Sequence, residues 1–250
     1  MKKISYLIIG LVIPVYASAD THPFFDSSRP EGYAPVVGIH AGAGVSTITQ
    51  NYYSQIENCS DFFFTPGVTT VFGASVELPV RNFLSIGTGA DFSISHYNWS
   101  MTVVEGSMST VNTLYNRNTY RTLEIPLYLK FAFNISDKVQ WTNQIGFYIS
   151  QGISGKSKYR AYVSSTDPLG QSQVTVSNYE RDYYKSADPV INGNSRTDIG
   201  ANIGTGLMFR QHWTLDIVLR AGFLNMARNN GVLDIREHNL AATFRFGYKF

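Results

Sequence analysis

Apolar side chains recur at every second position over eight stretches of the chain, and the positions between them carry small or polar side chains. In the clearest stretch, residues 123–133, Leu, Ile and Phe alternate with residues such as Glu124 and Lys130. A period of two is that of a β-strand with two chemically different faces. The alternation predicts strands near residues 36–47, 67–79, 84–95, 123–133, 139–150, 198–209, 213–223 and 240–250.

The connections between these predicted strands alternate in length. Those after the second, fourth and sixth strands have only a few residues, whereas those after the first, third, fifth and seventh run to roughly 20, 20, 40 and 12 residues. Barrels of the bacterial outer membrane have short periplasmic turns and long external loops. The pattern therefore predicts an all-β fold, an eight-stranded antiparallel up-and-down transmembrane β-barrel.

A secreted β-sandwich is the alternative, because its strands also alternate. A sandwich hides its large apolar side chains on the inner face and has no reason to place Gly and Ser opposite them in nearly every strand. In a narrow barrel surrounded by lipid, the large apolar side chains face outward and the interior has room mainly for small and polar ones. The small face of these strands therefore favours the barrel.

The N-terminus indicates export. Lys2 and Lys3 precede an apolar run at residues 4–16, and the small residues up to Ala19 predict cleavage between Ala19 and Asp20. The run is shorter than the roughly 20 residues of a spanning helix. We expect a signal peptide at residues 1–19, a short periplasmic segment at 20–33 and the outer-membrane barrel at 34–250.

Composition excludes some classes of function. Loss of the two signal-peptide lysines from the 20 Lys and Arg leaves them equal in number to the 18 Asp and Glu, so the mature chain is formally neutral. This balance gives no indication of a nucleic-acid partner. The single cysteine, Cys59, excludes an internal disulfide framework and a cysteine-based zinc site, and its polar surroundings at 51–61 suggest an incidental loop thiol.

The chain ends in alternating aromatic residues, Phe246, Tyr248 and Phe250. An open sheet edge in lipid would leave unpaired backbone groups that cost several kcal/mol each, so we expect the final strand to pair with the first. The aromatic side chains would lie at the periplasmic interface of the lipid. They also resemble the β-signal that the outer-membrane assembly machinery reads, which makes that machinery and outer-membrane lipid the expected partners.

The stretch 123–131, Leu-Glu-Ile-Pro-Leu-Tyr-Leu-Lys-Phe, resembles a strand of the outer-membrane β-barrel domain family widespread in Bacteroidetes, which includes PorT-like proteins. The resemblance extends over about residues 36–250, with support from 198–206, 220–225 and 246–250. The resemblance implies an eight-stranded barrel in the membrane. The family has no shared catalytic residues that could be assigned to this chain. Within the motif, Pro126 cannot donate to a ladder and predicts a bulge or local irregularity.

Charged residues recur on the predicted inner face at two depths, counted from the short turns. Two acids and two bases cancel at the first depth, and one acid is in excess at the second. Such charges are costly unless paired, so we interpret them as a network that fills and rigidifies the lumen, with a proton or ion path as the alternative. The first group is Glu77, Lys130, Asp216 and Arg245, and the second is Asp91, Glu124 and Arg220.

Candidate chemistry is sparse. The histidines at positions 22, 40, 96, 212 and 238 cannot be combined with Ser and Asp into a triad from strand parity and depth, and they have no metal-ligand spacing. We therefore assign no catalytic, cofactor-binding or metal-binding residue. The alternatives are a small outer-membrane enzyme acting on lipid and a narrow ion or proton pore.

The longest connection, residues 155–196, is rich in Tyr, Lys and Arg. Because Tyr and Arg are favoured in protein interfaces, we expect an extended loop that contacts an extracellular or envelope protein. The alternative is a pair of strand extensions above the membrane, joined as a hairpin across residues 161–179. Together the observations predict a monomeric, non-enzymatic barrel with a closed charged lumen, acting in envelope structure, in surface interaction or as a secretion accessory.

Overall fold

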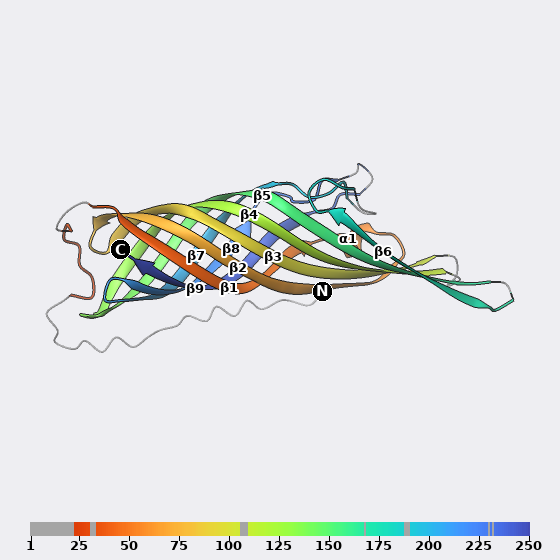
Figure 1. Cartoon of the computed structure of the whole chain (residues 1–250), viewed down its shortest axis with the longest axis horizontal. Coiled ribbons are helices and arrows are strands. Elements are labelled where there is room, and N and C mark those ends of the chain that lie inside the picture. Colours follow the sequence, from red (N-terminus) through yellow and green to blue (C-terminus); the bar gives the residue numbers. More distant parts are fainter. Residues whose placement is uncertain are drawn as a thin grey trace.

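The strands of the computed structural model form one antiparallel barrel (Figure 1). The structure describes residues 23–30, 34–105, 110–167, 169–187, 191–229, 231 and 233–250. The predicted signal peptide, its cleavage site at Ala19 and Asp20, and parts of the predicted segment 20–33 lie outside the described residues. No helix in the described ranges is long and apolar enough to cross a membrane.

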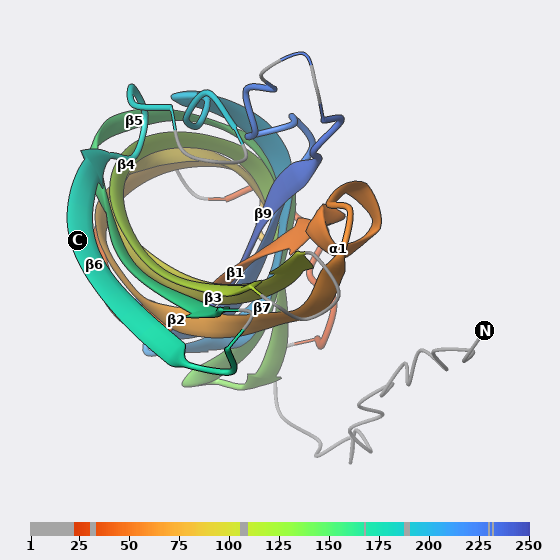
Figure 2. The same cartoon turned by 90° about the vertical axis from the view of Figure 1, so that its right-hand side faces the viewer.

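Nine strands and one short helix make up the described structure. Their bounds are β1 Val36–Gln50, α1 Tyr52–Gln55, β2 Cys59–Arg81, β3 Leu84–Glu105, β4 Thr110–Ser136, β5 Val139–Thr166, β6 Ser172–Asp182, β7 Thr197–Phe209, β8 Trp213–Gly222 and β9 Glu237–Lys249. All pairs are antiparallel, and neighbours along the chain pair except β6 and β7. β5 pairs with β4 along one edge, and along its other edge with β7 and, farther up, with β6. Seen along the axis, the strands curve into a ring (Figure 2).

Pairing of β9 with β1 closes the ring. The register runs from Gly38 opposite Lys249 to Gln50 opposite Glu237, so the final strand pairs with the first as expected. Eight strands form the ring, and β6 is an addition outside it. The eight predicted stretches lie in β1–β5 and β7–β9, and the predicted fold class is confirmed.

The two faces of the strands differ as the alternation predicts. Leu127 is 60% exposed and Phe244 is 54% exposed on the outside of the barrel, whereas Glu124 and Arg245 are buried inside it. Apolar residues of the same outward kind form a belt around the ring: Val37, Ile39, Val68, Phe72, Val76, Leu78, Ile86, Leu123, Ile125, Leu129, Ile145, Phe147, Ile149, Ile199, Ile203, Ile217, Leu219 and Phe246.

The two ends of the barrel are unlike. At the short-turn end, tight links join β2 to β3, β4 to β5 and β7 to β8. Residues 23–30 lie against these turns, where Phe24 stacks on Phe133 and Phe25 packs on Phe83. At the other end, which we call the extended end, β2–β6 run well beyond β7–β9 (Figure 1).

Strand extensions replace most of the predicted long loops. β3 continues to Glu105 and β4 starts at Thr110, and β5 continues to Thr166 and then pairs with β6. The preference for an extended loop over residues 155–196 is therefore wrong for much of that range. The alternative hairpin is present, with Ala161 opposite Ser177 and Tyr159 opposite Tyr179. Side chains continue to alternate past the apolar belt, although a bulge in β2 between Pro66 and Thr69 and one in β5 between Gly152 and Ser154 each shift the inward set by one residue. Cys59 accordingly begins β2 instead of lying in a loop.

Pro126 marks a local irregularity, as its missing N–H predicts. The β3–β4 ladder pairs Thr88 with Leu127 and Asp91 with Glu124, the positions between them are unpaired, and the register is unchanged across the gap. The Thr88 hydroxyl donates to the Pro126 carbonyl at 2.8 Å. The strand therefore continues through the proline without a bulge.

Candidate functional site in the barrel interior

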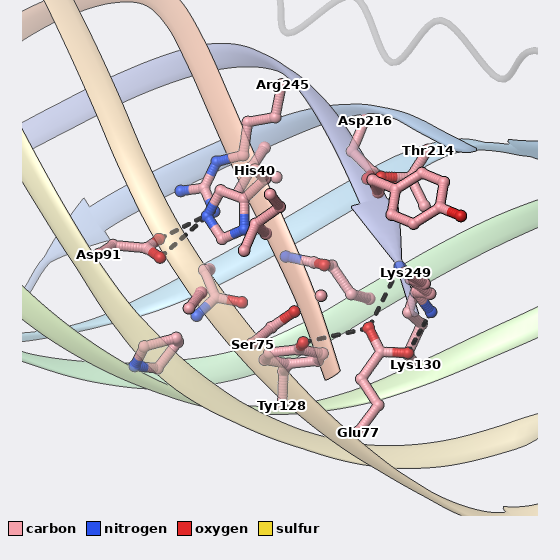
Figure 3. Close-up of a pocket in the computed structure, with 18 of the residues that line it drawn as sticks. His40, Ser75, Glu77, Asp91, Tyr128, Lys130, Thr214, Asp216, Arg245 and Lys249 are labelled. Atoms are coloured by element: carbon pink, nitrogen blue, oxygen red, sulfur yellow. Dashed lines mark hydrogen bonds and ion pairs between the residues drawn. The ribbon is translucent and has the colours of Figure 1, made fainter. Parts of the chain in front are cut away.

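The first ion-pair layer lies nearest the short-turn end and centres on Glu77 of β2. Lys130 Nζ of β4 is 3.4 Å from Glu77 Oε1, and Lys249 of β9 donates to Glu77 Oε2. The Tyr128 hydroxyl donates to Glu77 Oε1 at 3.2 Å. The carboxylate thus accepts from three side chains that converge from two other strands (Figure 3).

The second layer centres on Asp91 of β3. Arg245 Nη1 of β9 is 2.9 Å from Asp91 Oδ2, and His40 Nε2 of β1 is 2.9 Å from Asp91 Oδ1. Asp91 is 1% exposed. Figure 3 shows the imidazole and the guanidinium side by side on the carboxylate, and a Cβ at the neighbouring Gly73 would lie 2.1 Å from Asp91 Oδ1. Glycine on β2 therefore makes the room that this pair occupies.

Two further carboxylates lie closer to the extended end. Arg220 Nη1 of β8 donates to Glu124 Oε2 of β4 at 2.7 Å, with both side chains buried. Asp198 of β7 instead accepts hydrogen bonds from neutral groups, the Tyr148 hydroxyl at 3.2 Å and Asn239 Nδ2 at 3.0 Å. The interior is therefore crossed by successive polar layers that tie opposite strands together.

The seven charged residues expected in the lumen all face the interior, but their grouping differs from the prediction. Arg245 is directly opposite Asp216 in the β8–β9 ladder, as the common depth predicts, but its ion pair is with Asp91 of the other group. Asp216 accepts a hydrogen bond from the Thr142 hydroxyl at 3.3 Å and has no ion pair with a described residue. Counting residues from each turn therefore gave the depth of Asp216 and Arg245 correctly, but it did not predict the ion pair between the two groups, because contacts across the lumen depend on strand tilt.

Sequence reasoning missed two members of the network, His40 and Lys249. Both follow the inward parity of their strands, which was the available signal. With Lys249 included, four acids and four bases lie in the ion-pair region: Glu77, Asp91, Glu124 and Asp216 with Lys130, Arg220, Arg245 and Lys249. Asp198, a fifth acid next to them, accepts from neutral donors instead. A balanced set matters because a buried charge without a partner costs several kcal/mol.

The cavities between these layers are small. One of about 50 Å³ lies among the first two layers, and one of about 30 Å³ lies between Glu124, Arg220 and Asp198. A third of about 10 Å³ lies nearer the extended end, beside Tyr97 and Tyr183. Since a water molecule occupies about 30 Å³ of liquid, each cavity has space for about one or two waters at most.

An aromatic cluster fills the interior at the extended end. Tyr120 of β4 stacks on Tyr183 with ring centroids 5.1 Å apart, and Tyr97 of β3 meets Tyr183 edge to face. The Tyr97 and Tyr183 hydroxyls are 3.2 Å apart, and burial raises the pKa of both phenols well above the ordinary value. The cluster residues are Ile48, Tyr52, Tyr97, Trp99, Met101, Leu114, Tyr120, Tyr159, Tyr183, Tyr184, Ile191, Ala227 and Ile235.

Segments between strands fold inward to complete the cluster. Tyr52 of α1 stacks on Phe62 and donates to Glu237, and Ile191 and Ile235 are almost fully buried. Sequence reasoning offered the tyrosines of residues 155–196 as contact residues for a partner. Tyr159, Tyr183 and Tyr184 are instead at most 5% exposed. Tyr159 faces inward from β5, and Tyr183 and Tyr184 follow the end of β6 and lie in the cluster.

The remaining candidate residues are dispersed. His96 bonds the Val68 carbonyl and His212 bonds the Lys249 carbonyl, so neither joins a titratable cluster. In the described ranges, no three or more His, Cys, Asp or Glu residues lie together as metal ligands would. Cys59 is a free thiol whose pKa is raised by partial burial.

The C-terminal aromatic residues lie at the short-turn end. Phe246 stacks on Trp213 at 5.2 Å, and Tyr248 packs edge to face on Phe250 at 5.1 Å. Phe250 is 70% exposed, and its N–H donates to the Val37 carbonyl at 2.9 Å. These side chains form an outward aromatic group at the edge of the apolar belt.

Several solved structures are similar to the chain. Solved structures similar to the chain include Ail of Yersinia pestis (15% identity, 86% of this chain and 98% of that one, TM-score 0.33) and Neisserial surface protein A (12%, 86% and 97%, 0.35). The outer-membrane protein OprG of Pseudomonas aeruginosa is also similar (11%, 90% and 99%, 0.37). No curated protein matches the chain significantly.

The sequence profile of the outer membrane protein beta-barrel domain family matches residues 27–228. The chain therefore belongs to this family, and it is an outer-membrane protein.

Proposed function

We propose that this outer-membrane barrel is a closed, non-enzymatic, monomeric scaffold that holds an ordered β-sheet outside the cell for contact with a surface or envelope protein. Short turns face the periplasm in bacterial outer-membrane barrels, so we place the extended end outside. One observation carries the proposal: the interior is filled by ion pairs and aromatic rings, while β2–β6 continue beyond it.

The filled interior supports a barrel that does not conduct. Eight strands enclose a space that side chains can fill, and the cavities of this interior hold about one or two waters each. We expect no channel activity from the purified protein in planar bilayers. If the wild type conducts and Asp91→Asn or Arg220→Gln changes that conductance, the interior is an ion or proton path and the scaffold proposal fails.

The free edge of β6 supports the contact with a protein. β6 is the last strand of the sheet order, and its second edge pairs with no described strand. Val174 and Val176 on this strand are 60% and 50% exposed. An exposed edge offers a row of backbone donors and acceptors to which an extended segment of a partner can add. Envelope organisation and the secretion role suggested by PorT-like relatives are both roles that such a contact would serve.

Crosslinking in intact cells tests the contact. A photoreactive residue at Val174 should give a discrete protein adduct, whereas one at Lys138, in the turn at the opposite end, should not give the same adduct. Pro at Val174 should remove an adduct formed from a neighbouring probe at Val176, because proline cannot complete a ladder. Equal adducts from both ends, or none from β6, would contradict the proposal.

An enzyme acting on lipid is the second candidate, and the interior disfavours it. The His40–Asp91 pair is the one His-carboxylate ion pair in the described residues, and it is buried against Arg245 with side-chain exposures of 15% and 1%. A general base must reach the proton that it removes. Turnover of lipid that is lost on substituting a residue of the outer rim, such as His238, would establish the enzyme instead.

The C-terminal aromatic residues are proposed to serve assembly. Phe246 and Phe250 point outward at the edge of the belt, where the assembly machinery can reach them before the barrel is complete. Deletion of Phe250 should lower the amount of folded barrel in the membrane, and Phe250→Tyr should not. Unchanged assembly after the deletion would remove this role.

A further inference from the structure

The outer face of the extended end carries a strip of cations on two neighbouring strands. Even-numbered residues of β4 above the belt, such as Asn116 and Asn118, are buried, and the residues between them face out. On this part of β5 the odd-numbered residues, such as Ser157 and Tyr159, are buried and the even-numbered ones face out. The basic strip consists of Arg117 and Arg121 on β4 and Lys156, Lys158 and Arg160 on β5, all exposed.

Register places like charges beside each other in this strip. Arg117 is directly opposite Lys158, and the next outward pairs are Thr119–Lys156 and Tyr115–Arg160. Like charges directly opposite on a sheet are destabilising. The fold therefore maintains a repulsion at its surface that a bound anion would relieve.

Counter-charges within the chain offset only part of the strip. Glu180 of β6 lies 2.7 Å from Lys156 Nζ and 3.7 Å from Lys158 Nζ. Arg160 donates to Asn178 and Arg121 donates to Ser154, both neutral partners. Arg117 has no carboxylate partner among the residues that the structure describes. Asp182 of β6 is directly opposite Lys156 and accepts from the backbone N–H groups of Tyr184 and Lys185. Two acids thus face five bases, and the excess is positive.

A cleft lies over the strip. Its volume is about 910 Å³, and its lining includes Arg117, Lys158 and Arg160 together with Tyr115 and Tyr162, whose rings meet edge to face at 5.8 Å. Aromatic and polar side chains next to cations suit a sugar that bears negative charge. Guanidinium groups bind phosphate oxygens through two parallel hydrogen bonds, which gives such a site specificity.

The strip continues directly into the apolar belt. On β4, Leu123 and Ile125 follow Arg121 on the same outward face. On β5, Ile153 lies just before Lys156. These three apolar side chains are 42%, 57% and 49% exposed. A molecule that spans this boundary has an acyl portion against the belt and an anionic head against the strip.

We infer that the basic strip and its cleft bind the phosphorylated sugar headgroup of an anionic glycolipid in the outer leaflet, with the acyl chains lying on the belt residues of β4 and β5. Arg117 and Lys158 hold one phosphate between them, and Arg121 and Lys156 lie closer to the acyl chains. The continuity of charge with the apolar surface favours a lipid over a free anionic glycan.

Retention of lipid A by the full barrel tests the inference. The protein is placed in phosphatidylcholine nanodiscs that contain bisphosphorylated lipid A, extracted into detergent, and the fraction carrying lipid A is read from native mass spectra. Arg117→Gln/Lys158→Gln should lower retention by about tenfold, since the phosphate loses charge-assisted hydrogen bonds. Lys138→Gln/Arg210→Gln removes the same charge at the short turns and should leave retention unchanged.

Three results would overturn the inference. The first is equal retention by the two double variants when both show the heat-dependent gel shift of a folded barrel. The second is equal retention of lipid A and its dephosphorylated form by the wild type. The third is binding of a soluble phosphorylated oligosaccharide as tightly as lipid A, which would assign the strip to a free glycan.

Discussion

The same strands carry opposite patterns in the belt and at the extended end. On the outer face of β4, Leu123 and Leu127 lie in the belt, whereas Arg117 and Arg121 lie above it. The change takes place within two residues and without a break in the strand. The strand backbone is therefore the same whichever face is apolar, and the medium around the strand determines which face carries the apolar side chains.

The interior changes in the opposite sense. Within the belt, β3 and β4 direct Asp91 and Glu124 inward, and above it the same faces carry Tyr97, Trp99 and Tyr120. Because water surrounds the extended end, burial of aromatic surface inside it is favourable, as in a soluble protein. Lipid outside the belt accepts apolar side chains, so there the interior is held by paired charges and hydrogen bonds. The position at which both faces invert marks the edge of the bilayer.

Breaking a charge pair inside the belt should have the largest effect. Glu124→Ala leaves Arg220 buried without its carboxylate, and we expect a loss of about 3–5 kcal/mol in the free energy of unfolding. Urea unfolding in lipid vesicles measures it. Glu124→Leu/Arg220→Met removes both charges and should recover most of the loss. A double variant as unstable as the single one would show that the pair itself, and not the stranded charge, sets the stability.

Introducing a charge on the outer face should have the second-largest effect, and the effect should differ between the belt and the extended end. Leu127→Arg places a cation in lipid and should cost about 2–4 kcal/mol, with the cost falling for positions nearer the interface. Val174→Arg makes the same change at an exposed apolar residue of β6, in water, and should stay within about 0.5 kcal/mol. Equal costs for the two variants in the same unfolding assay would place the bilayer edge elsewhere.

The sequence predicted the belt half of the molecule well because two-residue periodicity depends only on strand geometry. It did not predict the ion pair of Arg245 with Asp91, because which positions meet across the lumen depends on strand tilt and stagger. It also missed the aromatic cluster, although Tyr97, Trp99 and Met101 continue the inward parity of Asp91. The long connections were interpreted as loops because their outward side chains are polar. A strand that is surrounded by water also has polar outward side chains, so the sequence did not distinguish the two.

The tyrosines of the cluster make stability depend on high pH. Because burial raises the pKa of Tyr97 and Tyr183, the folded protein retains protons that the unfolded chain releases above pH ~10. Stability is thus complete below pH ~10 and is lost as pH rises, by about 1.4 kcal/mol per pH unit for each such group. Tyr183→Phe should reduce the slope of unfolding free energy against pH, and Tyr53→Phe, at a 60% exposed residue, should not.

The smallest effect tests the comparison most directly, since two glutamates each face two lysines in different surroundings. Glu77 meets Lys130 and Lys249 in the interior, and Glu180 meets Lys156 and Lys158 on the exposed face. The hydrogen bond from Lys156 lowers the pKa of Glu180, so any stability that this pair adds is present at neutral pH and lost toward acid. Water and salt screen the pair, and Glu180→Gln should leave the urea midpoint unchanged at neutral and at acidic pH.

Glu77→Gln removes the same charge from a carboxylate that is only 5% exposed and that two lysines approach, and it should lower the urea midpoint measurably at neutral pH. The ratio of the two effects reports how differently the belt interior and the extended end are solvated. A Glu180→Gln variant as unstable as Glu77→Gln would mean that the outer face of β6 is covered in the folded protein. The free edge on which the partner contact depends would then be occupied by the protein itself.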